Sequence, residues 1–318
     1  MRLFNQIEIA MNEFEIITEK TANFKAFINV LKYRAPHLHA EFELALVLYG
    51  ELLVTLDKKS YKLSTGDIIC LNPFVLHELS SAMNVPILFI QVSPSFFKNT
   101  VPMMKNIDFL ETPIIGKSDS KAYGLIREKF IEFAMLFFKQ EKGFALRCNG
   151  VLSLLFAELL DYLPYKMVSS QDYLNNQTKA RRIKRIAEYI DRNYQGKICL
   201  SDLAKLENVT ETHISHFFTE NFHITFQQYL MKLRCEKARS LLLTTNLPLI
   251  DISVTCGFSD PKYLNSGFIK QYGVLPKEYR KSFGDSKLEL QQSSLLSTQQ
   301  ILSNKTSLAL LQRSVDLD

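Results

Sequence analysis

Three histidines and one glutamate in the first third of the chain have the types and spacing of a ligand-binding site. His37, His39 and Glu43 form the pattern His-x-His-x3-Glu, and His77 follows an Asn72–Pro73 turn further along. Imidazole and carboxylate groups bind zinc, nickel, iron or manganese, and they also hydrogen-bond polar organic molecules. The first three positions share parity, so on one strand they would point to the same face. We therefore expect the four side chains to meet in one pocket.

Three interpretations of these residues are consistent with the sequence. They are ligands of a divalent metal, contacts to a polar small-molecule effector in a metal-free pocket (with Tyr33, Tyr49 or Gln91 nearby), or structural groups satisfied within the protein. The candidate effector-binding residues are Tyr33, His37, His39, Glu43 and His77, and the candidate metal ligands are the last four of these. No second acid–base pair accompanies the histidines, so we predict no catalytic residues, no enzyme and no certain cofactor.

The segment that carries these residues has the pattern of a small β-domain followed by helices. Between Phe24 and Phe97, short apolar runs alternate with turn residues, which predicts several strands in a barrel or sandwich. After Gly116, apolar residues recur every three or four positions, which predicts helices over 121–139 and 146–163. The sequence therefore predicts an effector-binding domain over 1–165, made of a β-barrel and two helices.

Composition and cysteine usage favour a cytoplasmic protein. Hydrophobic residues make up 47% and charged residues 22% of the chain, as in folded globular proteins. No apolar run reaches the roughly 18 residues of a membrane span, so no membrane contact is expected. The five cysteines are odd in number and show no Cys-x-x-Cys spacing, which favours reduced thiols. Glu8, Glu13 and Glu15 interrupt the N-terminal stretch, which therefore does not have the pattern of a signal peptide.

Positive charge is concentrated in the last third of the chain. Residues 179–281 contain 17 Lys and Arg against 10 Asp and Glu, a net +7, whereas the remainder has 21 against 23, a net −2. The chain as a whole carries +5. A basic excess confined to one region is expected where that region meets a polyanion such as double-stranded DNA.

The same region contains an internal repeat. Residues 200–229 align with residues 249–279, at an offset of 49 positions before a central turn and 50 after it. The matched pairs are Asp202 with Asp251, Leu203 with Ile252, Ala204 with Ser253, Val209 with Phe258, Ile214 with Leu264, Phe218 with Phe268, Phe222 with Tyr272 and Tyr229 with Tyr279. Self-similarity of this kind indicates one structural unit used twice.

Each copy has the pattern of a helix-turn-helix. Asn208 and Gly257 occupy equivalent turn positions, and both residue types tolerate a left-handed backbone. Thr210 in the first copy, and Ser259 or Asp260 in the second, are suitable N-caps for the following helix. That second helix is the element that enters the DNA major groove. We therefore predict sequence-specific DNA binding.

The polar faces of the two second helices supply the candidate DNA contacts. These are Glu211, Thr212, Ser215, His216 and Thr219 in the first copy, and Pro261, Lys262, Asn265, Ser266 and Lys270 in the second. Between the copies, residues 226–244 contain no Gly or Pro and predict one helix, roughly 28 Å long at 1.5 Å per residue. Such a rod would hold the two DNA-reading helices about one DNA turn, near 34 Å, apart.

Two further segments complete the predicted organisation. The polar stretch around 169–178 predicts a linker over 166–180, ahead of a seven-helix DNA-binding domain over 181–284. The Ser-, Gln- and Leu-rich residues 285–318 lack strong helix caps, and we expect a poorly ordered tail, with a weak amphipathic helix as the alternative. The predicted fold class is thus α+β and multidomain.

Residues 183–283 strongly resemble the AraC/XylS family of bacterial transcription regulators. The matching positions are Leu200, Leu203, Ala204, His213, Ile214 and Phe218, then Arg234, Ala238 and Leu242, and finally Ile252, Gly257, Phe258, Tyr263, Phe268, Lys270, Gly273, Pro276, Tyr279 and Arg280. The family commonly has arginine where His216 and Ser266 stand here. Arginine is the side chain best suited to bidentate guanine contacts, so the family's base preferences do not transfer directly to this chain.

The histidine pattern resembles the two cupin motifs, in which three His and one Glu converge inside a small barrel. Regulators of the AraC type commonly carry such a barrel as their effector domain. The resemblance implies a regulator that forms a homodimer through residues 121–163 and contacts RNA polymerase. The alternative is a metal-dependent cupin enzyme fused to a DNA-binding module, which turnover with bound metal would reveal.

Overall fold

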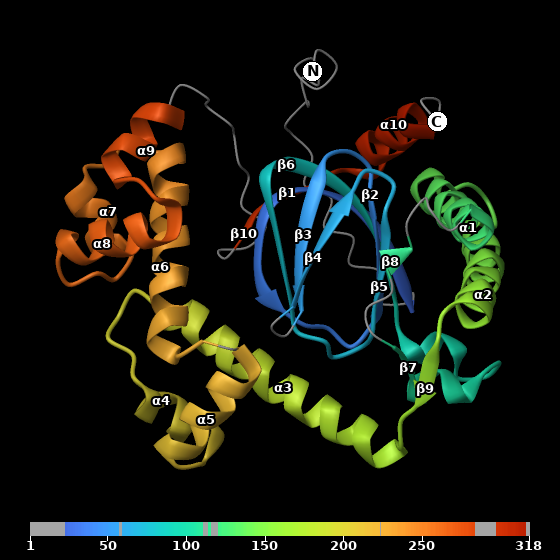
Figure 1. Cartoon of the computed structure of the whole chain (residues 1–318), viewed down its shortest axis with the longest axis horizontal. Coiled ribbons are helices and arrows are strands. Elements are labelled where there is room, and N and C mark those ends of the chain that lie inside the picture. Colours follow the sequence, from blue (N-terminus) through green and yellow to red (C-terminus); the bar gives the residue numbers. More distant parts are fainter. Residues whose placement is uncertain are drawn as a thin grey trace.

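The computed structural model describes residues 23–56, 59–110, 114–115, 120–222, 224–283 and 297–315. It consists of a β-barrel with helices on one side and a separate lobe of helices on the other, and one long helix runs beneath the barrel between them (Figure 1). The predicted α+β, two-part architecture is therefore confirmed. The sequence features at 1–16 lie outside the described residues.

Ten strands are present in the described part of the chain. Their bounds are β1 Phe24–His37, β2 Phe42–Val47, β3 Glu51–Leu56, β4 Lys59–Ser64, β5 Ile68–Leu71, β6 His77–Val92, β7 Ile107–Phe109, β8 Ile114–Ile115, β9 Tyr165–Met167 and β10 Ser297–Ile301. The main sheet follows the order β10-β1-β6-β2-β5-β8, and β3 pairs with both β4 and the first part of β6. The long strand β6 therefore pairs with β1, β2 and β3, and it begins at the predicted ligand residue His77.

Alternation along the strands separates two hydrophobic cores. In β2, Phe42, Leu44 and Leu46 belong to a core under the neighbouring helices, whereas Ala45 and Val47 belong to the barrel interior. All six residues of β2 are buried because both faces of the strand are covered. Two 3-10 helices, Pro94–Phe97 and Pro102–Asn106, connect the barrel to the helices that follow.

Three helices cover the outer face of the barrel. The predicted pair is confirmed as α1 Ser120–Lys139 and α2 Phe144–Tyr162. The third, α10 Asn304–Val315, lies in the predicted tail, for which an amphipathic helix was the alternative to poor order. Buried Leu302 and Leu311 join the core beneath α1 and α2, and β10 pairs antiparallel with β1. The expectation of poor order is therefore wrong for 297–315 and the helical alternative holds for 304–315, while 285–296 and 316–318 lie outside the described residues.

Seven helices form the DNA-binding lobe, as the sequence predicts. They are α3 Ser170–Asn193, α4 Leu200–Glu207, α5 Glu211–Phe222, α6 Phe226–Thr244, α7 Leu249–Thr255, α8 Pro261–Tyr272 and α9 Pro276–Phe283. The connecting helix α6 has the predicted bounds, and a capping box of Thr225 and Gln228 fixes its start. The predicted linker differs: Ser169 caps α3 through the backbone N–H of Asp172, so residues 170–180 are helical.

The predicted turns and caps of the repeat are confirmed. Asn208 and Gly257 both adopt left-handed backbone conformations, with φ of 53° and 81°. The Thr210 hydroxyl accepts from the N–H of His213, and the Asp260 carboxylate accepts from that of Lys262, so Asp260 rather than Ser259 caps the second copy. The two units therefore share one local design.

The cysteines of the described segments are free thiols, and four of the five are buried. None of the helices in the described segments is long and apolar enough to cross a membrane.

Candidate functional site

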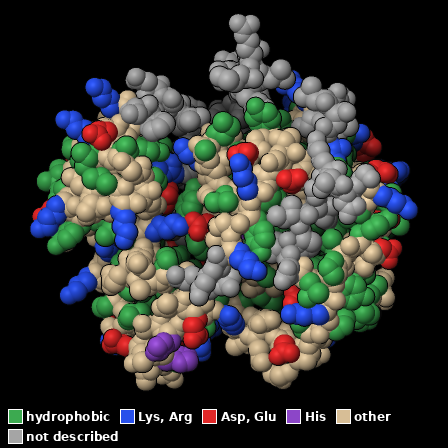
Figure 2. Space-filling view, viewed as in Figure 1, with side chains coloured by type: hydrophobic (Ala, Val, Ile, Leu, Met, Phe, Trp, Pro, Cys, Tyr) green, Lys and Arg blue, Asp and Glu red, His purple; other side chains and the backbone are tan. Residues whose placement is uncertain are grey.

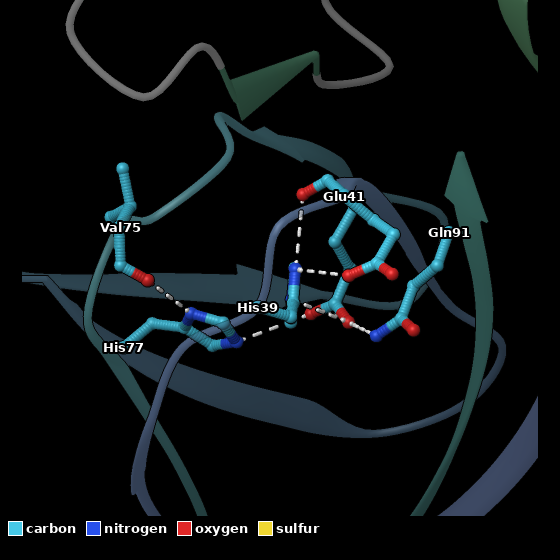
Figure 3. A network of polar contacts seen from close by, with 6 residues as sticks. His39, Glu41, Val75, His77 and Gln91 are labelled. Carbon is cyan, nitrogen blue, oxygen red and sulfur yellow. Dashed lines mark hydrogen bonds and ion pairs between the residues drawn. The ribbon is translucent and has the colours of Figure 1, made fainter. Parts of the chain in front are cut away.

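The four predicted ligand residues lie close together in the barrel, and Figure 3 shows the polar contacts of His39 and His77. His37 ends β1, Glu43 lies in β2 and His77 begins β6, while His39 lies in the connection between β1 and β2. The expectation that the first three share one strand is therefore wrong, because the chain turns between His39 and Glu43. The convergence itself is confirmed: His39 Nε2 lies 3.1 Å from Glu43 Oε2, and His77 Nε2 lies 3.3 Å from Glu43 Oε1.

Backbone carbonyls fix the orientation of two of the imidazoles. Nδ1 of His39 donates to the carbonyl of Glu41, and Nδ1 of His77 donates to that of Val75, each at 3.0 Å (Figure 3). A neutral imidazole that donates through Nδ1 carries its lone pair on Nε2. Both Nε2 atoms therefore face the carboxylate of Glu43, where either a proton on Nε2 or a cation between the groups would balance the negative charge.

Burial and neighbouring charges shift the pKa values of three residues in this cluster. Burial lowers the pKa of His77 below its ordinary value, although Glu43 acts in the opposite direction. Burial also lowers the pKa of His37 well below its ordinary value, and the charges of His77 and Arg34 add to this effect. For Glu43, burial alone would raise the pKa, but the charge and hydrogen bond of His39, together with His77, hold that pKa well below its usual range. The cluster thus combines an ionised Glu43 carboxylate with two imidazoles, those of His37 and His77, whose pKa values are lowered by burial.

These residues fit a divalent metal ion. One ligand atom each from His37, Glu43 and His77 lies within 4.8 Å of the others, and His39 points its Nε2 at the same carboxylate. Imidazoles tied through Nδ1 to a backbone carbonyl are the usual form of protein metal ligands, because the second hydrogen bond fixes the ring and its tautomer. Three imidazoles and one carboxylate suit zinc, nickel, iron or manganese.

The other residues near the predicted pocket are distributed differently. The Gln91 side-chain amide donates to Glu43, so Gln91 belongs to the cluster. Tyr33 does not: its ring lies under the Lys232 ammonium of α6, 5.1 Å away. Tyr49 is exposed. Sequence reasoning missed Arg34, because nothing in its spacing marks it as facing the cluster. Burial lowers the pKa of Arg34, and the negative charge of Glu43 acts in the opposite direction.

The DNA-reading faces predicted for α5 and α8 are accessible. On α5, Glu211, Thr212, His216 and Thr219 are exposed and Ser215 is half-buried. Figure 2 shows exposed histidine side chains gathered over α5, and Lys and Arg side chains spread over the lobe of α6 to α9. On α8, the exposed residues are Lys262, Ser266 and Lys270, while Pro261 and Asn265 are half-buried.

Two of the candidate hydroxyls already donate within their own helices. Thr219 Oγ1 donates to the carbonyl of Ser215, and Ser266 Oγ donates to that of Tyr263. They retain lone pairs and so can still accept from a base or water. Lys262 lies over the ring of Tyr263 with its Nζ 3.8 Å from Asp260, so its charge stays at the start of α8.

Family comparisons divide the chain in the same way as the structure. Residues 30–102 match the family described as AraC-like ligand binding domain, and residues 203–282 match a helix-turn-helix domain. The transcriptional activator RhaS of Mannheimia succiniciproducens is 23% identical over 257 residues, which are 79% of this chain and 93% of that protein. The lactose operon transcription activator of Staphylococcus xylosus is 24% identical over 76% of this chain and 84% of its own length.

Solved structures give matches of two kinds. The C-terminal domain of the response regulator yesN from Fusobacterium nucleatum is 37% identical, covering 31% of this chain and 98% of its own, with a TM-score of 0.31. ToxT from Vibrio cholerae is 14% identical, covering 82% of this chain and 98% of its own, with a TM-score of 0.43. With both family matches in place, the chain belongs to the AraC family of DNA-binding transcription regulators, with a ligand-binding domain ahead of a double helix-turn-helix domain.

Proposed function

We propose that the regulator's ligand is a divalent transition-metal ion, held by His37, His39, Glu43 and His77. The observation that carries this proposal is the pair of Nε2 atoms that face one buried carboxylate while both Nδ1 atoms donate to carbonyls. A metal ion between them accepts both lone pairs and balances the carboxylate charge. The alternative is a polar organic molecule that hydrogen-bonds the same side chains.

Metal titration of the full chain tests this proposal. After chelator treatment, Co²⁺ should bind one ion per chain and give visible d–d absorption, and Zn²⁺ should displace it. Glu43→Gln and His77→Ala should each weaken binding by about a hundredfold or more, since each removes a direct ligand. His213→Ala, on the exposed surface of α5, is the matched control and should bind as the parent does. If the chain binds none of zinc, nickel, iron and manganese at micromolar concentration, the proposal is rejected.

For the DNA interface, we propose that the exposed faces of α5 and α8 enter successive major grooves of double-stranded DNA. The net +7 of residues 179–281 supports this, as do the accessible reading helices. Phosphate contacts release counterions, so affinity should fall by about tenfold or more for a threefold rise in salt. A mobility-shift titration at several salt concentrations measures this slope, and a flat slope would contradict the proposal.

We also propose that the regulator is a homodimer that uses the outer face of α2. Leu146 and Leu154 are 79% and 53% exposed there, and Gly150 between them has open space above it. Helix α1 is the weaker candidate, because α10 packs against it. Sedimentation of the parent should show a dimer at micromolar concentration, and Leu146→Glu with Leu154→Glu should give a monomer. A parent that sediments as a monomer throughout would exclude this interface.

The remaining predictions concern the setting of the protein. The matched relatives are named as transcription regulators, which supports a role without catalysis. A contact with RNA polymerase and a cytoplasmic location stay predictions from the family resemblance.

A further inference from the structure

The sensor barrel contacts the DNA-binding lobe next to the ligand cluster. Leu38 and Leu76 of the barrel pack against the hydrophobic core formed by α3, α4, α5 and the first half of α6. Two polar contacts adjoin them. Lys232 of α6 forms an ion pair with Glu78 of β6, and its ammonium lies 5.1 Å from the ring centroid of Tyr33.

The residues that make this contact alternate along the chain with the cluster residues. Leu38 lies between His37 and His39, and His77 lies between Leu76 and Glu78. His37 is the last residue of β1 and His77 is the first residue of β6. The same two short segments therefore carry imidazoles of the cluster and residues that contact the lobe, so a change in imidazole position would act directly on the neighbouring contacts.

The apolar part of this contact, among the residues that the structure describes, is confined to one of the two helix-turn-helix units. The core of the second unit is formed by α7, α8, α9 and the later part of α6, and it contains no barrel residue among those that the structure describes. That unit is held instead by α6, where Glu236 accepts from Arg239, Gln271 and Tyr272. Barrel leucines next to the ligand cluster thus pack against the core of the first unit and not against that of the second, which is near the barrel through the charge interaction of Glu236 with Tyr33.

We infer that docking on the sensor restrains the first helix-turn-helix unit alone, so that the ligand regulates the DNA half-site read by α5 while α8 binds its half-site in every state. The link to the ligand rests on the proposed function of the histidine cluster; the unit-specific restraint rests on the contacts of Leu38, Leu76 and Lys232. Both reading faces are exposed in the docked form, so the restraint acts on the orientation of α5 and not by covering it.

The first test needs no ligand. The full chain selects its preferred DNA site from a random library, and each half of that site is then scrambled in turn. A DNA-cleaving iron chelate on Glu220→Cys of α5, in a Cys199→Ser background, shows which half the first unit contacts. Lys232→Ala and Leu76→Ala should each raise affinity for DNA that retains the first unit's half by at least threefold. Affinity for DNA that retains the other half should stay within 1.5-fold.

Matched variants separate docking from general effects. Lys62→Ala breaks an ion pair of 2.8 Å with Glu51 on the barrel, and Leu53→Ala removes an exposed leucine from β3; both should leave DNA affinity unchanged. Leu76→Ala removes a packed side chain and can therefore lower the melting temperature. In that case the Lys232→Ala result is used, since the Lys232 side chain is partly exposed and its removal should disturb the fold less. Equal changes on both half-sites, a loss at the first, a change confined to the second, or no change would overturn the inference.

A second arm connects the restraint to the ligand. Adding Zn²⁺ to the parent should change affinity for the first half-site alone, and Lys232→Ala should reduce that response by at least half. If Zn²⁺ does not bind, the proposed ligand is wrong, and the variant results still decide whether docking is specific to one unit. If Zn²⁺ binds and alters both half-sites equally, the inference fails although the ligand site stands.

Discussion

The two helix-turn-helix units have the same frame but are held in place by different neighbours. Both begin their turn with a left-handed residue, Asn208 in the first and Gly257 in the second. A Cβ on Gly257 would lie 2.5 Å from the carbonyl oxygen of Tyr194 and 2.7 Å from that of Gln195. The second unit therefore presses its turn against the backbone that follows α3, whereas the first unit places a larger side chain at the same point and docks on the sensor.

This difference indicates which part of the protein controls each unit. The second is fixed within the DNA-binding lobe through Gly257 and the buried Glu236 network, so its position follows the lobe. The first shares its core with Leu38 and Leu76 of the barrel, so its position also follows the sensor. The two copies of the repeat are similar in sequence, but within the described residues the core of the second is held only by other parts of the lobe, whereas that of the first is also held by the barrel.

Replacing the turn residues should produce the largest difference between the units. Gly257→Ala adds a Cβ that meets backbone atoms and retains a positive φ, so it should lower the free energy of unfolding by roughly 4 kcal/mol. Asn208→Ala creates no new contact, but alanine tolerates the left-handed backbone less well than asparagine, so the free energy of unfolding should fall by about 1 kcal/mol. Urea denaturation of both variants measures this, and equal losses would show that the close approach at Gly257 is not what distinguishes the units.

Removing one buried charge from each unit should give the next largest contrast. Glu236→Gln leaves the buried Arg239 without its carboxylate and should cost about 2–3 kcal/mol of unfolding free energy. Glu207→Gln is the matched change in the first unit, where the partner Arg185 is 57% exposed and stays hydrated, so the loss should be about 1 kcal/mol. Denaturant midpoints of the two variants decide, and a larger loss for Glu207→Gln would reverse the comparison.

The reading helices should contribute differently to sequence preference. His216→Ala on α5 should reduce base discrimination by roughly 1–2 kcal/mol at one half-site, because an exposed imidazole can donate to or accept from a base edge. Lys262→Ala at the start of α8 should weaken all sequences alike and flatten the salt slope, because an ammonium at a helix N-terminus contacts phosphate. Affinities over single-base variants of the operator separate these effects. Relaxed specificity in Lys262→Ala with unchanged specificity in His216→Ala would exchange the two roles.

The smallest expected effect is a pH dependence at the junction of the two units, where α6 packs against the end of α3. Lys237 is buried against Asp191 and the ring of Tyr194, and burial lowers its pKa to about 8. Above pH 8 the folded lysine loses its proton while the unfolded one, with pKa near 10.5, keeps it, so stability should rise by about 1 kcal/mol between pH 8 and 9. Lys237→Met should lack this rise. If the stability of the parent and of Lys237→Met changes with pH in the same way, Lys237 is not the group responsible for the rise.

Local patterns predicted the elements of the lobe but not their attachments. Helix α6 was bounded correctly because its limits are local: a cap at Thr225 and the Asn246-to-Pro248 break after it. The helical start of α3 was missed because a polar stretch resembles a linker, although Ser169 was available as a cap. The contacts of Lys232 with Glu78 and of Leu76 with the first unit join residues far apart in sequence, and no spacing rule reveals them.

The ligand cluster shows the same limit. Residue types and order predicted that His37, His39, Glu43 and His77 would meet. The turn between His39 and Glu43, and the carbonyls of Glu41 and Val75 that orient two of the rings, depend on how β1, β2 and β6 close into a barrel. Tyr33 was predicted to lie near the pocket, but the Lys232 ammonium of α6 lies over its ring, so Tyr33 belongs to the contact with the lobe.

The pairing of β10 with β1 has a consequence for synthesis on the ribosome. Strand β1 is made early, but its partner at residues 297–301 emerges about 260 residues later, after the whole DNA-binding lobe. At roughly 10 residues per second, the β1 edge waits for about half a minute without its partner strand. An unpaired strand edge is a template for pairing with other chains. Nascent chains stalled before residue 297 should therefore recruit chaperones more strongly than chains released after α10.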